Sequence, residues 1–302
     1  MIPQFSPLSV EHLPLVLTYA RALPGRICDR TAGILYMWAE QLDTCLAQVD
    51  GMLLLRSVWE GRTVYACPAG EGDMRAAVTA CRADAEALGV PLCFASITTD
   101  DAARIRAALG SPCTEESDDG WSDYLYAADA LAALEGRAYH GPRNHINRFC
   151  AEYPAYRYTP LTPDQLPEVE EFYAAHRART AETAGPSALA EAEAAARLLS
   201  LYPALLAGGA DLLGGVLRVN GEIAGFSLGE VLGDTLFVHI EKANTAFNGV
   251  YPMLVREFAR LGTDRGLRYI NREEDDGHPG LRRSKQSYHP TAWLKKLLLL
   301  CP

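Results

Sequence analysis

Apolar and polar positions alternate along the first half of the chain with the spacing of successive helices and strands. Apolar residues at helical spacing predict a helix over residues 10–22, which ends at the Pro-Gly pair that follows. Apolar runs over 52–59 and 63–67, on either side of a Glu-Gly turn, predict a β-hairpin. The same patterns predict a helix over 74–88 and a strand over 91–97. Helices and strands joined by short connections are typical of layered α/β or α+β folds.

The second half of the chain repeats this order. We expect a strand over 156–161, helices over 163–178 and 188–206, a hairpin over 212–219 and 223–231, a strand over 236–241, a helix over 250–262, a strand over 267–273, and a short apolar tail over 293–299. The Asn220-Gly221 pair is a strong signal for a two-residue hairpin turn. Because the composition changes after Ala127, we expect two domains, residues 1–130 and 131–302.

Composition and charge narrow the class of protein. The chain has 302 residues, of which 49% are apolar and 22% charged, values typical of a soluble globular protein. Its net charge of -10 means that nucleic acid or anionic lipid would have to be met by a local basic patch. No signal peptide opens the chain, and the longest apolar stretch, 198–210, is too short to span a bilayer. We therefore expect a cytoplasmic protein without a transmembrane segment.

The eight cysteines form no CxxC pair and have no zinc-ligand spacing with histidine. Most of them lie among apolar neighbours, so we expect reduced core residues. Glu273, Asp275, Asp276 and His278 are residue types that bind hard cations, but their spacing matches no recognised loop. We expect no metal site.

Charge gathers at the ends of two late strands. Residues 268–288 hold five basic and four acidic side chains, which nearly neutralise one another. A second segment, 238–258, has a strand that ends in the pair Glu241-Lys242 and is followed by a turn and a helix. Adjacent strand ends that carry charge are where α/β folds assemble sites. One alternative for residues 268–288 is a surface loop with weak salt bridges. Another, for Glu241, Lys242, Arg272 and Glu273, is a buried ion-pair network between the strands.

A basic stretch lies near the expected domain boundary. Residues 136–149 contain three arginines and two histidines without an acid. Such a patch suits phosphate or carboxylate binding. It could equally be a solvated helix whose arginines pair with the acidic excess elsewhere.

Four segments in the second half resemble the C-terminal catalytic-domain family of phosphatidylglycerol lysyltransferases. They are Arg143-Asn144-His145-Ile146-Asn147-Arg148-Phe149, Val238-His239-Ile240-Glu241-Lys242-Ala243, the stretch from Ile270 to Gly277, and the stretch from Gly280 to Tyr288. The resemblance implies two tandem folds of the Gcn5-related N-acyltransferase (GNAT) type, with mixed sheets in an α/β (α+β) arrangement. Membrane-bound members move an aminoacyl group from aminoacyl-tRNA to a lipid, and this chain resembles their soluble, stand-alone relatives.

The donor-binding loop departs from the acetyltransferase pattern. GNAT acetyltransferases hold the coenzyme A pyrophosphate on a Q/R-x-x-G-x-G/A loop before the central helix. Here that loop is Asn244-Thr245-Ala246-Phe247-Asn248-Gly249-Val250, with one glycine and no basic residue. An aminoacyl ester donor is favoured over acyl-CoA.

Acyl transfer needs a base for the nucleophile's proton and a positive group near the developing oxyanion. Strand alternation sends His239 and Glu241 to one face, so Glu241 and Glu273 could share one cleft, where one carboxyl pKa would rise. We expect the catalytic residues to be Glu241, Lys242, Glu273, Asp275 and Lys285. The substrate-binding candidates are Arg143, Asn144, His145, Arg272, Asp276, Arg282, Arg283 and Tyr288.

These observations predict an acyltransferase that transfers an aminoacyl group to an amine or hydroxyl acceptor. No resident cofactor is expected, and the donor substrate is an aminoacyl-tRNA or an acyl-CoA. The expected partners are the acceptor end of aminoacyl-tRNA and a small-molecule or lipid-like acceptor. Two alternatives stay open: an acyl-CoA-dependent N-acyltransferase, and a non-catalytic module that binds a small anionic or amino-acid ligand.

Overall fold

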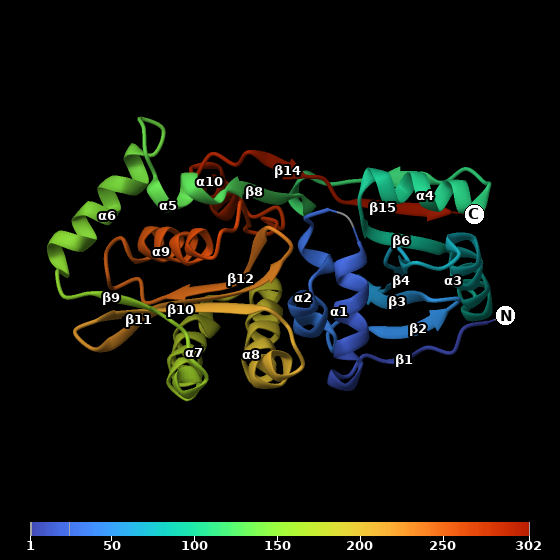
Figure 1. Cartoon of the computed structure of the whole chain (residues 1–302), viewed down its shortest axis with the longest axis horizontal. Coiled ribbons are helices and arrows are strands. Elements are labelled where there is room, and N and C mark those ends of the chain that lie inside the picture. The colour runs from blue at the N-terminus through green and yellow to red at the C-terminus, as the bar shows by residue number, and fades with distance from the viewer. Residues whose placement is uncertain (1, 24, 302) are drawn as a thin grey trace. The chain divides into compact units, whose positions relative to one another are not determined.

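The computed structural model describes residues 2–23 and 25–301, which fall into two compact units (Figure 1). The first unit holds the chain up to Asp123 and again from Leu294 onward, and the second is Tyr124–Trp293. These limits differ from the expected ranges 1–130 and 131–302, because the C-terminal residues return to the first unit.

The first unit is built on a mixed sheet with the strand order β1-β2-β3-β4-β6-β15-β7, in which β5 also pairs with β3. Its elements are β1 (Ser6–Pro7), η1 (Val10–His12), α1 (Leu13–Ala22), η2 (Cys28–Arg30), α2 (Ala32–Trp38), β2 (Cys45–Val49), β3 (Met52–Trp59), β4 (Arg62–Tyr65), β5 (Ala69–Gly70), α3 (Met74–Leu88), β6 (Leu92–Ile97), α4 (Thr99–Leu109), β7 (Thr114–Glu116), η3 (Asp119–Trp121) and β15 (Leu297–Cys301). Strands β4 and β6 pair in parallel, through Tyr65 and Phe94.

The two faces of this sheet carry different helices. Leu54 of β3 packs with α3 and α4 residues such as Val78 and Ile105 in one core. Leu53 and Leu55 point to the other face, since side chains alternate along a strand. There they line a hollow together with residues of α1 and α2.

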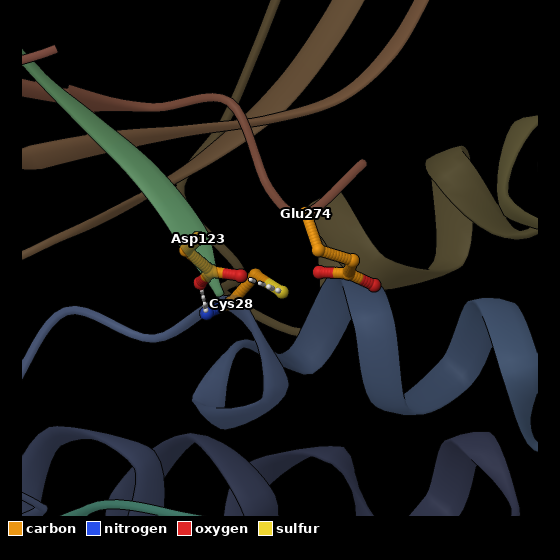
Figure 2. A group of neighbouring side chains, drawn as sticks. All are labelled: Cys28, Asp123 and Glu274. Carbon is orange, nitrogen blue, oxygen red and sulfur yellow. Dashed lines mark hydrogen bonds between the residues drawn. The ribbon is translucent and has the colours of Figure 1, made fainter. Parts of the chain in front are cut away.

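The expected apolar tail is a strand. The run Leu297–Cys301 pairs with β6 on one side and β7 on the other. Just before it, the buried Lys296 Nζ lies 2.8 Å from Asp123 Oδ1 and 2.7 Å from Asp29 Oδ2. Asp123 also accepts a 2.7 Å hydrogen bond from the backbone N–H of Cys28 (Figure 2). These contacts fix the start of β15 within the first unit.

Two cysteines are not reduced, contrary to our expectation. Cys113 and Cys301 form a disulfide, 188 residues apart in the sequence. Cys301 belongs to β15 and Cys113 immediately precedes β7, so strand pairing brings the two residues together. The other six cysteines are free thiols.

The second unit is built on a seven-stranded sheet with the order β14-β8-β13-β12-β11-β10-β9. Its elements are β8 (Asp123–Ala127), α5 (Ala128–Ala133), α6 (His140–Glu152), β9 (Arg157–Pro160), η4 (Pro163–Gln165), α7 (Leu166–Thr180), η5 (Ala181–Thr183), α8 (Pro186–Ala207), β10 (Leu212–Val219), β11 (Glu222–Leu232), β12 (Thr235–Ala243), α9 (Val250–Asp264), β13 (Tyr269–Asn271), α10 (Pro279–Gln286) and β14 (Ala292–Leu294). Helices α7 and α8 lie on one face of this sheet, and α5 and α9 on the other (Figure 1). No helix in the described part of the chain is both long and apolar enough to cross a bilayer.

The hairpin expected at Asn220-Gly221 is confirmed. Strands β10 and β11 pair across this turn, and both central residues have positive φ angles, 52° and 90°. A two-residue hairpin turn of this type requires positive φ at both positions, which asparagine and glycine tolerate.

Strands β12 and β13 are parallel neighbours, as expected, but their pairing is short. It runs from Thr235 opposite Tyr269 to Phe237 opposite Asn271. On its other edge, β12 carries a β-bulge in which His239 is the extra residue, because the strand advances by two residues where β11 advances by one.

Candidate functional site

Two side-chain bridges span β12 and the segment after β13, beyond the point where their backbone pairing stops. His239 Nδ1 lies 2.7 Å from Glu273 Oε1. Arg272 donates a 2.6 Å hydrogen bond to Glu241 Oε2. The charged ends of the two strands are therefore joined by side chains where the backbones no longer pair.

His239 lies between two carboxylates. Its ring is fully buried, and its Nε2 lies 3.8 Å from Glu230 Oε2, an ion-pair distance beyond hydrogen-bond reach. Burial alone would lower the pKa of His239, but Glu230 and Glu273 outweigh burial and raise it to about 9. The imidazole is therefore protonated at neutral pH.

Glu273 is the accessible member of this group. Its side chain is 18% exposed, whereas that of Glu230 is 2% exposed. Burial raises the pKa of Glu273, and the contact with His239 opposes that rise. Its backbone has a φ of 56°, an unusual value for a residue other than glycine, and its N–H donates to Asn271 Oδ1. A carboxylate that is partly exposed to solvent and has a raised pKa has the properties of a general base.

Glu241 and Glu273 lie on opposite faces of the sheet. Glu241 is opposite Ser227 on β11, whereas Glu273 contacts His239, which lies beside Glu230. Ser227 and Glu230 are three residues apart on one strand, so their side chains point to opposite faces. The prediction that the two carboxylates share one cleft is wrong, because the bulge at His239 breaks the alternation on which it depended.

The Glu241–Arg272 pair belongs to the core on the α9 side. The Arg272 guanidinium lies over the ring of the buried Tyr288, 5.2 Å from its centroid. Burial by itself would lower the pKa of Arg272. Glu241 and the nearby tyrosines raise this pKa by more than burial lowers it, so the guanidinium stays charged. Its Nε and Nη1 atoms have no hydrogen-bond partner among the described residues.

Asp275 is a structural anion. Its fully buried carboxylate accepts hydrogen bonds from Tyr124 Oη (2.5 Å), Arg282 Nε and Nη2 (2.8 and 3.0 Å) and the Gly277 N–H (2.9 Å). Burial would raise the pKa of Asp275, but these donors together lower it. Contrary to our expectation, Asp275 is not available as a base, and Arg282 is committed to it and not to a substrate.

Lys285 is also committed within the protein. Its buried ammonium donates to the backbone carbonyls of Arg272 (2.5 Å), Glu273 (3.2 Å) and Glu274. It therefore fixes the turn that carries Glu273 and does not face a reacting carbonyl, which corrects its expected role near the oxyanion.

The residues of the basic stretch do not converge on one point. Arg143 donates two 2.6 Å hydrogen bonds to the carbonyls of Leu134 and Gly136 and so caps the end of α5. Asn144 is exposed and contacts His140, and His145 is exposed on α6. Two further candidates are exposed in the α10 region: Arg283 on the helix itself, and Asp276, which accepts a 3.0 Å hydrogen bond from Ser187 of α8.

Lys242 lies in a different environment, at a hollow of about 500 Å³ between α7 and α8. Its ammonium is 2.7 Å from Glu191 Oε1. The hollow is lined by Lys242 and by Tyr173, Ala174, His176, Arg177, Ala178, Thr180, Ala181, Ala184, Ala188, Leu189, Glu191, Ala192 and Glu193. It combines alanine walls with charges of both signs.

Helix α6 closely approaches the N-terminus of α9. Gly249 caps it with a φ of 84°, and a Cβ at this position would lie 2.5 Å from the carbonyl oxygen of His145 in α6. The Phe247 ring contacts that of Tyr153, with centroids 5.3 Å apart. Helix α6 therefore restricts the space at this end of α9.

Sequence reasoning missed Glu230, Glu191 and the role of His239. Glu230 is a lone acid near the end of an apolar strand, and such a position indicates a buried partner of opposite charge. Glu191 lies in an alanine-rich helix and gave no signal, because its partner Lys242 is 51 residues away.

Comparison with known proteins identifies related sequences and structures. The family described as "Phosphatidylglycerol lysyltransferase, C-terminal" matches residues 20–299. No curated protein matches the chain. A conserved protein of unknown function from Bacteroides thetaiotaomicron VPI-5482 is 31% identical over the whole of both chains, with a TM-score of 0.90.

Two more distant structures share the fold. The C-terminal domain of a putative lysylphosphatidylglycerol synthetase from Agrobacterium fabrum has a TM-score of 0.68 at 14% identity, covering 97% of this chain and 92% of the other. The L-PGS structure from Bacillus licheniformis has a TM-score of 0.67 at 15% identity, covering 95% and 90%. Together with the two mixed sheets, these matches confirm the expected mixed α/β architecture.

Proposed function

The chain belongs to the phosphatidylglycerol lysyltransferase C-terminal family, an acyltransferase family, and from this premise we propose that it is an aminoacyltransferase. The donor is an ester of the aminoacyl-tRNA type, and the acceptor is an amine or a hydroxyl on a small or lipid-like molecule. A cytoplasmic location, where aminoacyl-tRNA is found, is part of this proposal.

The close approach of α6 to the N-terminus of α9 is the observation that carries the choice of donor. In acyl-CoA-dependent GNAT enzymes the pyrophosphate is held by free amides at this helix end. Here α6 approaches so closely at Gly249 that a single added carbon would lie 2.5 Å from its backbone. No basic side chain lies in the loop 244–250 to replace those amides. A donor without a pyrophosphate does not need this helix end.

Glu273 is the base in this proposal. The acceptor nitrogen or oxygen attacks the ester carbonyl carbon and forms a new C–N or C–O bond. The bond from that carbon to the ribose oxygen breaks, and the leaving oxygen gains a proton. Glu273 takes the proton that the acceptor loses, and His239, which is 2.7 Å away, positions its carboxylate. His239 acts through Glu273 and has no contact with the substrate in this scheme.

The hollow between α7 and α8 is the proposed acceptor site. Its volume of about 500 Å³ is within the range of small-molecule pockets. Lys242 and Glu191 offer one charge of each sign at its wall. Helix α8 also contacts Asp276 through Ser187, and Asp276 is three residues after Glu273. The same helix therefore borders the hollow and contacts the turn that carries the base.

A non-catalytic module is the second candidate, because several charges at the site satisfy one another. Glu241 with Arg272 and Asp275 with Arg282 form closed pairs that need no substrate. A protein that only binds a ligand would retain such pairs and would not need Glu273 in a reactive state.

The two candidates and the coenzyme A alternative differ in what stabilises the protein. We would measure the melting temperature with a non-hydrolysable 3′-aminoacyl-adenosine amide, with acetyl-CoA, and with adenosine as the control. The proposal expects only the aminoacyl analogue to raise the melting temperature. At a hundredfold excess over Kd, the bound analogue should add about 2.7 kcal/mol to the free energy of unfolding. Stabilisation by acetyl-CoA would favour an acyl-CoA enzyme, and stabilisation by none of the three would favour the non-catalytic module.

A further inference from the structure

The first unit has its own parallel strand pair, and a hollow opens where that pair ends. Strands β4 and β6 pair only at Tyr65 and Phe94. Immediately beyond them, Ala66 and Cys67, which follow β4, and Ser96 of β6 line a hollow whose water-accessible space is about 50 Å³. In the second unit, the corresponding position beyond the β12–β13 pairing is occupied by the charged side-chain bridges described above.

The walls of the hollow are mostly apolar. Side chains of α1, α2 and β3 form them: Val16, Tyr19, Ala20, Leu23, Leu35, Leu53 and Leu55. Ser96 is exposed and marks the mouth. One water needs roughly 10–15 Å³ of such space, so the hollow has room for about four water-sized groups. That is the size of a short aliphatic chain with a polar head.

Arg30 lines this hollow and has one unused donor. Its side chain is only 6% exposed, and its Nη2 hydrogen-bonds Asp101. Its Nη1 is buried and has no hydrogen-bond partner among the described residues. A buried N–H without a partner destabilises the folded protein, and more so when the group is charged. An acceptor atom bound in the hollow would remove this cost.

The carboxylates beside Arg30 are already engaged by other groups. Asp101 is shared by two guanidinium groups, since Arg104 lies 3.8 Å from its Oδ1. Asp101 also accepts hydrogen bonds from the N–H and hydroxyl of Thr98, so it has little capacity left for a ligand. The second carboxylate at the hollow, Asp29, is paired with Lys296 at 2.7 Å. Lys296 also pairs with Asp123 at 2.8 Å, so Arg30, Arg104, Lys296 and the three aspartates balance in formal charge. What favours an acceptor group at this hollow is therefore the unused Nη1 of Arg30, not an excess of positive charge.

We propose that this hollow binds a short aliphatic carboxylate, of about four or five non-hydrogen atoms, whose head accepts a hydrogen bond from Arg30 Nη1 and whose tail lies against the α1 and α2 leucines. The Cys67 thiol beside it does not compete as an anion, since burial raises its pKa to about 12. The site is separate from the groups assigned to acyl transfer, and it does not depend on that assignment.

The test is calorimetric titration of the full chain with sodium propionate at constant ionic strength, with propionamide and sodium chloride as controls. We expect saturable binding of propionate and none of propionamide. Arg30→Lys keeps the charge beside Asp101 but removes the planar second donor, and it should weaken binding at least tenfold. Arg75→Lys, on the exposed face of α3, should leave binding unchanged.

Two results would overturn the proposal. One is the absence of saturable propionate binding to the wild-type chain, which would mean that the hollow holds only water. The other is equal affinity in a folded Arg30→Lys variant. If that variant does not fold, a crystal structure of the wild-type chain grown in propionate decides the question. Propionate density beside Arg30 Nη1 supports the proposal, and water alone refutes it.

Discussion

Two carboxylates in the turn after β13 have the same chemistry and different roles. Asp275 is fully buried and is held by four donors, which lower its pKa. Glu273, two residues earlier, has one side-chain partner, His239, and a raised pKa. A carboxylate saturated with donors stabilises a fold, whereas one that is partly exposed and more basic can exchange a proton. The sequence shows four consecutive acids in this turn, Glu273 to Asp276, and does not distinguish these two roles.

Glu273→Gln should separate chemistry from stability. The amide keeps an acceptor oxygen for His239, and Glu230 remains beside the imidazolium, so we expect a change in melting temperature of only a few degrees. We expect aminoacyl transfer to fall by roughly 10²–10⁴-fold, because the amide cannot take a proton. The measurement is release of labelled amino acid from aminoacyl-tRNA to acceptor, together with a melting curve.

Asp275→Asn is the matched comparison for that variant. It removes the charge that compensates Arg282, and we expect a loss of about 2–3 kcal/mol in the free energy of unfolding. Normal aminoacyl transfer by Glu273→Gln would mean that Glu273 is not the base. Unfolding of Glu273→Gln with a stable Asp275→Asn would mean that Glu273, and not Asp275, is the structural anion.

At the scale of single elements, the sequence predicts those helices and turns that depend on residues close together in the chain. The hairpin at Asn220-Gly221 and the amphipathic helix α9 depend on residues near one another in sequence, and both were expected within a few residues of their observed limits. The bulge at His239 has no such pattern, because it depends on the register against β11. The position of Glu241 relative to Glu273 could therefore not be predicted from alternation along one strand.

The contact between α6 and the start of α9 gives a prediction for Gly249. Alanine there would combine a φ of 84° with a Cβ 2.5 Å from the His145 carbonyl. Gly266, just beyond the end of the same helix, has a φ of 77° and open space around it. The left-handed conformation costs alanine about 1–2 kcal/mol at either position. We expect Gly249→Ala to lose at least about 1 kcal/mol more than Gly266→Ala in urea unfolding.

Equal losses in the two variants would mean that α6 is not held against the start of α9. The argument against a pyrophosphate-containing donor would then lose its structural support, whatever the outcome for Glu273.

At the scale of the whole molecule, the chain leaves the first unit at Asp123 and returns to it at Leu294. The apolar run near the C-terminus gave no sign of its partners, because β6 and β7 lie nearly two hundred residues earlier. Tandem domains were apparent from the repeated order of elements. The strand that completes the first sheet was not, since strand pairing over such a distance leaves no local pattern.

The disulfide between Cys113 and Cys301 tests this topology. It closes a loop of 188 residues, so in the chain-entropy account it stabilises the fold by up to about 5 kcal/mol. A reductant opens this loop, so it should lower the midpoint of urea unfolding of the wild-type chain. In the Cys113→Ser, Cys301→Ser double variant the midpoint should already be low and should not respond to reductant, because the six remaining cysteines are free thiols.

If the wild-type midpoint did not change on reduction, pairing of β15 with β6 and β7 would hold the returning segment without the covalent bond. If the double variant still responded, another pair of cysteines would have to be oxidised.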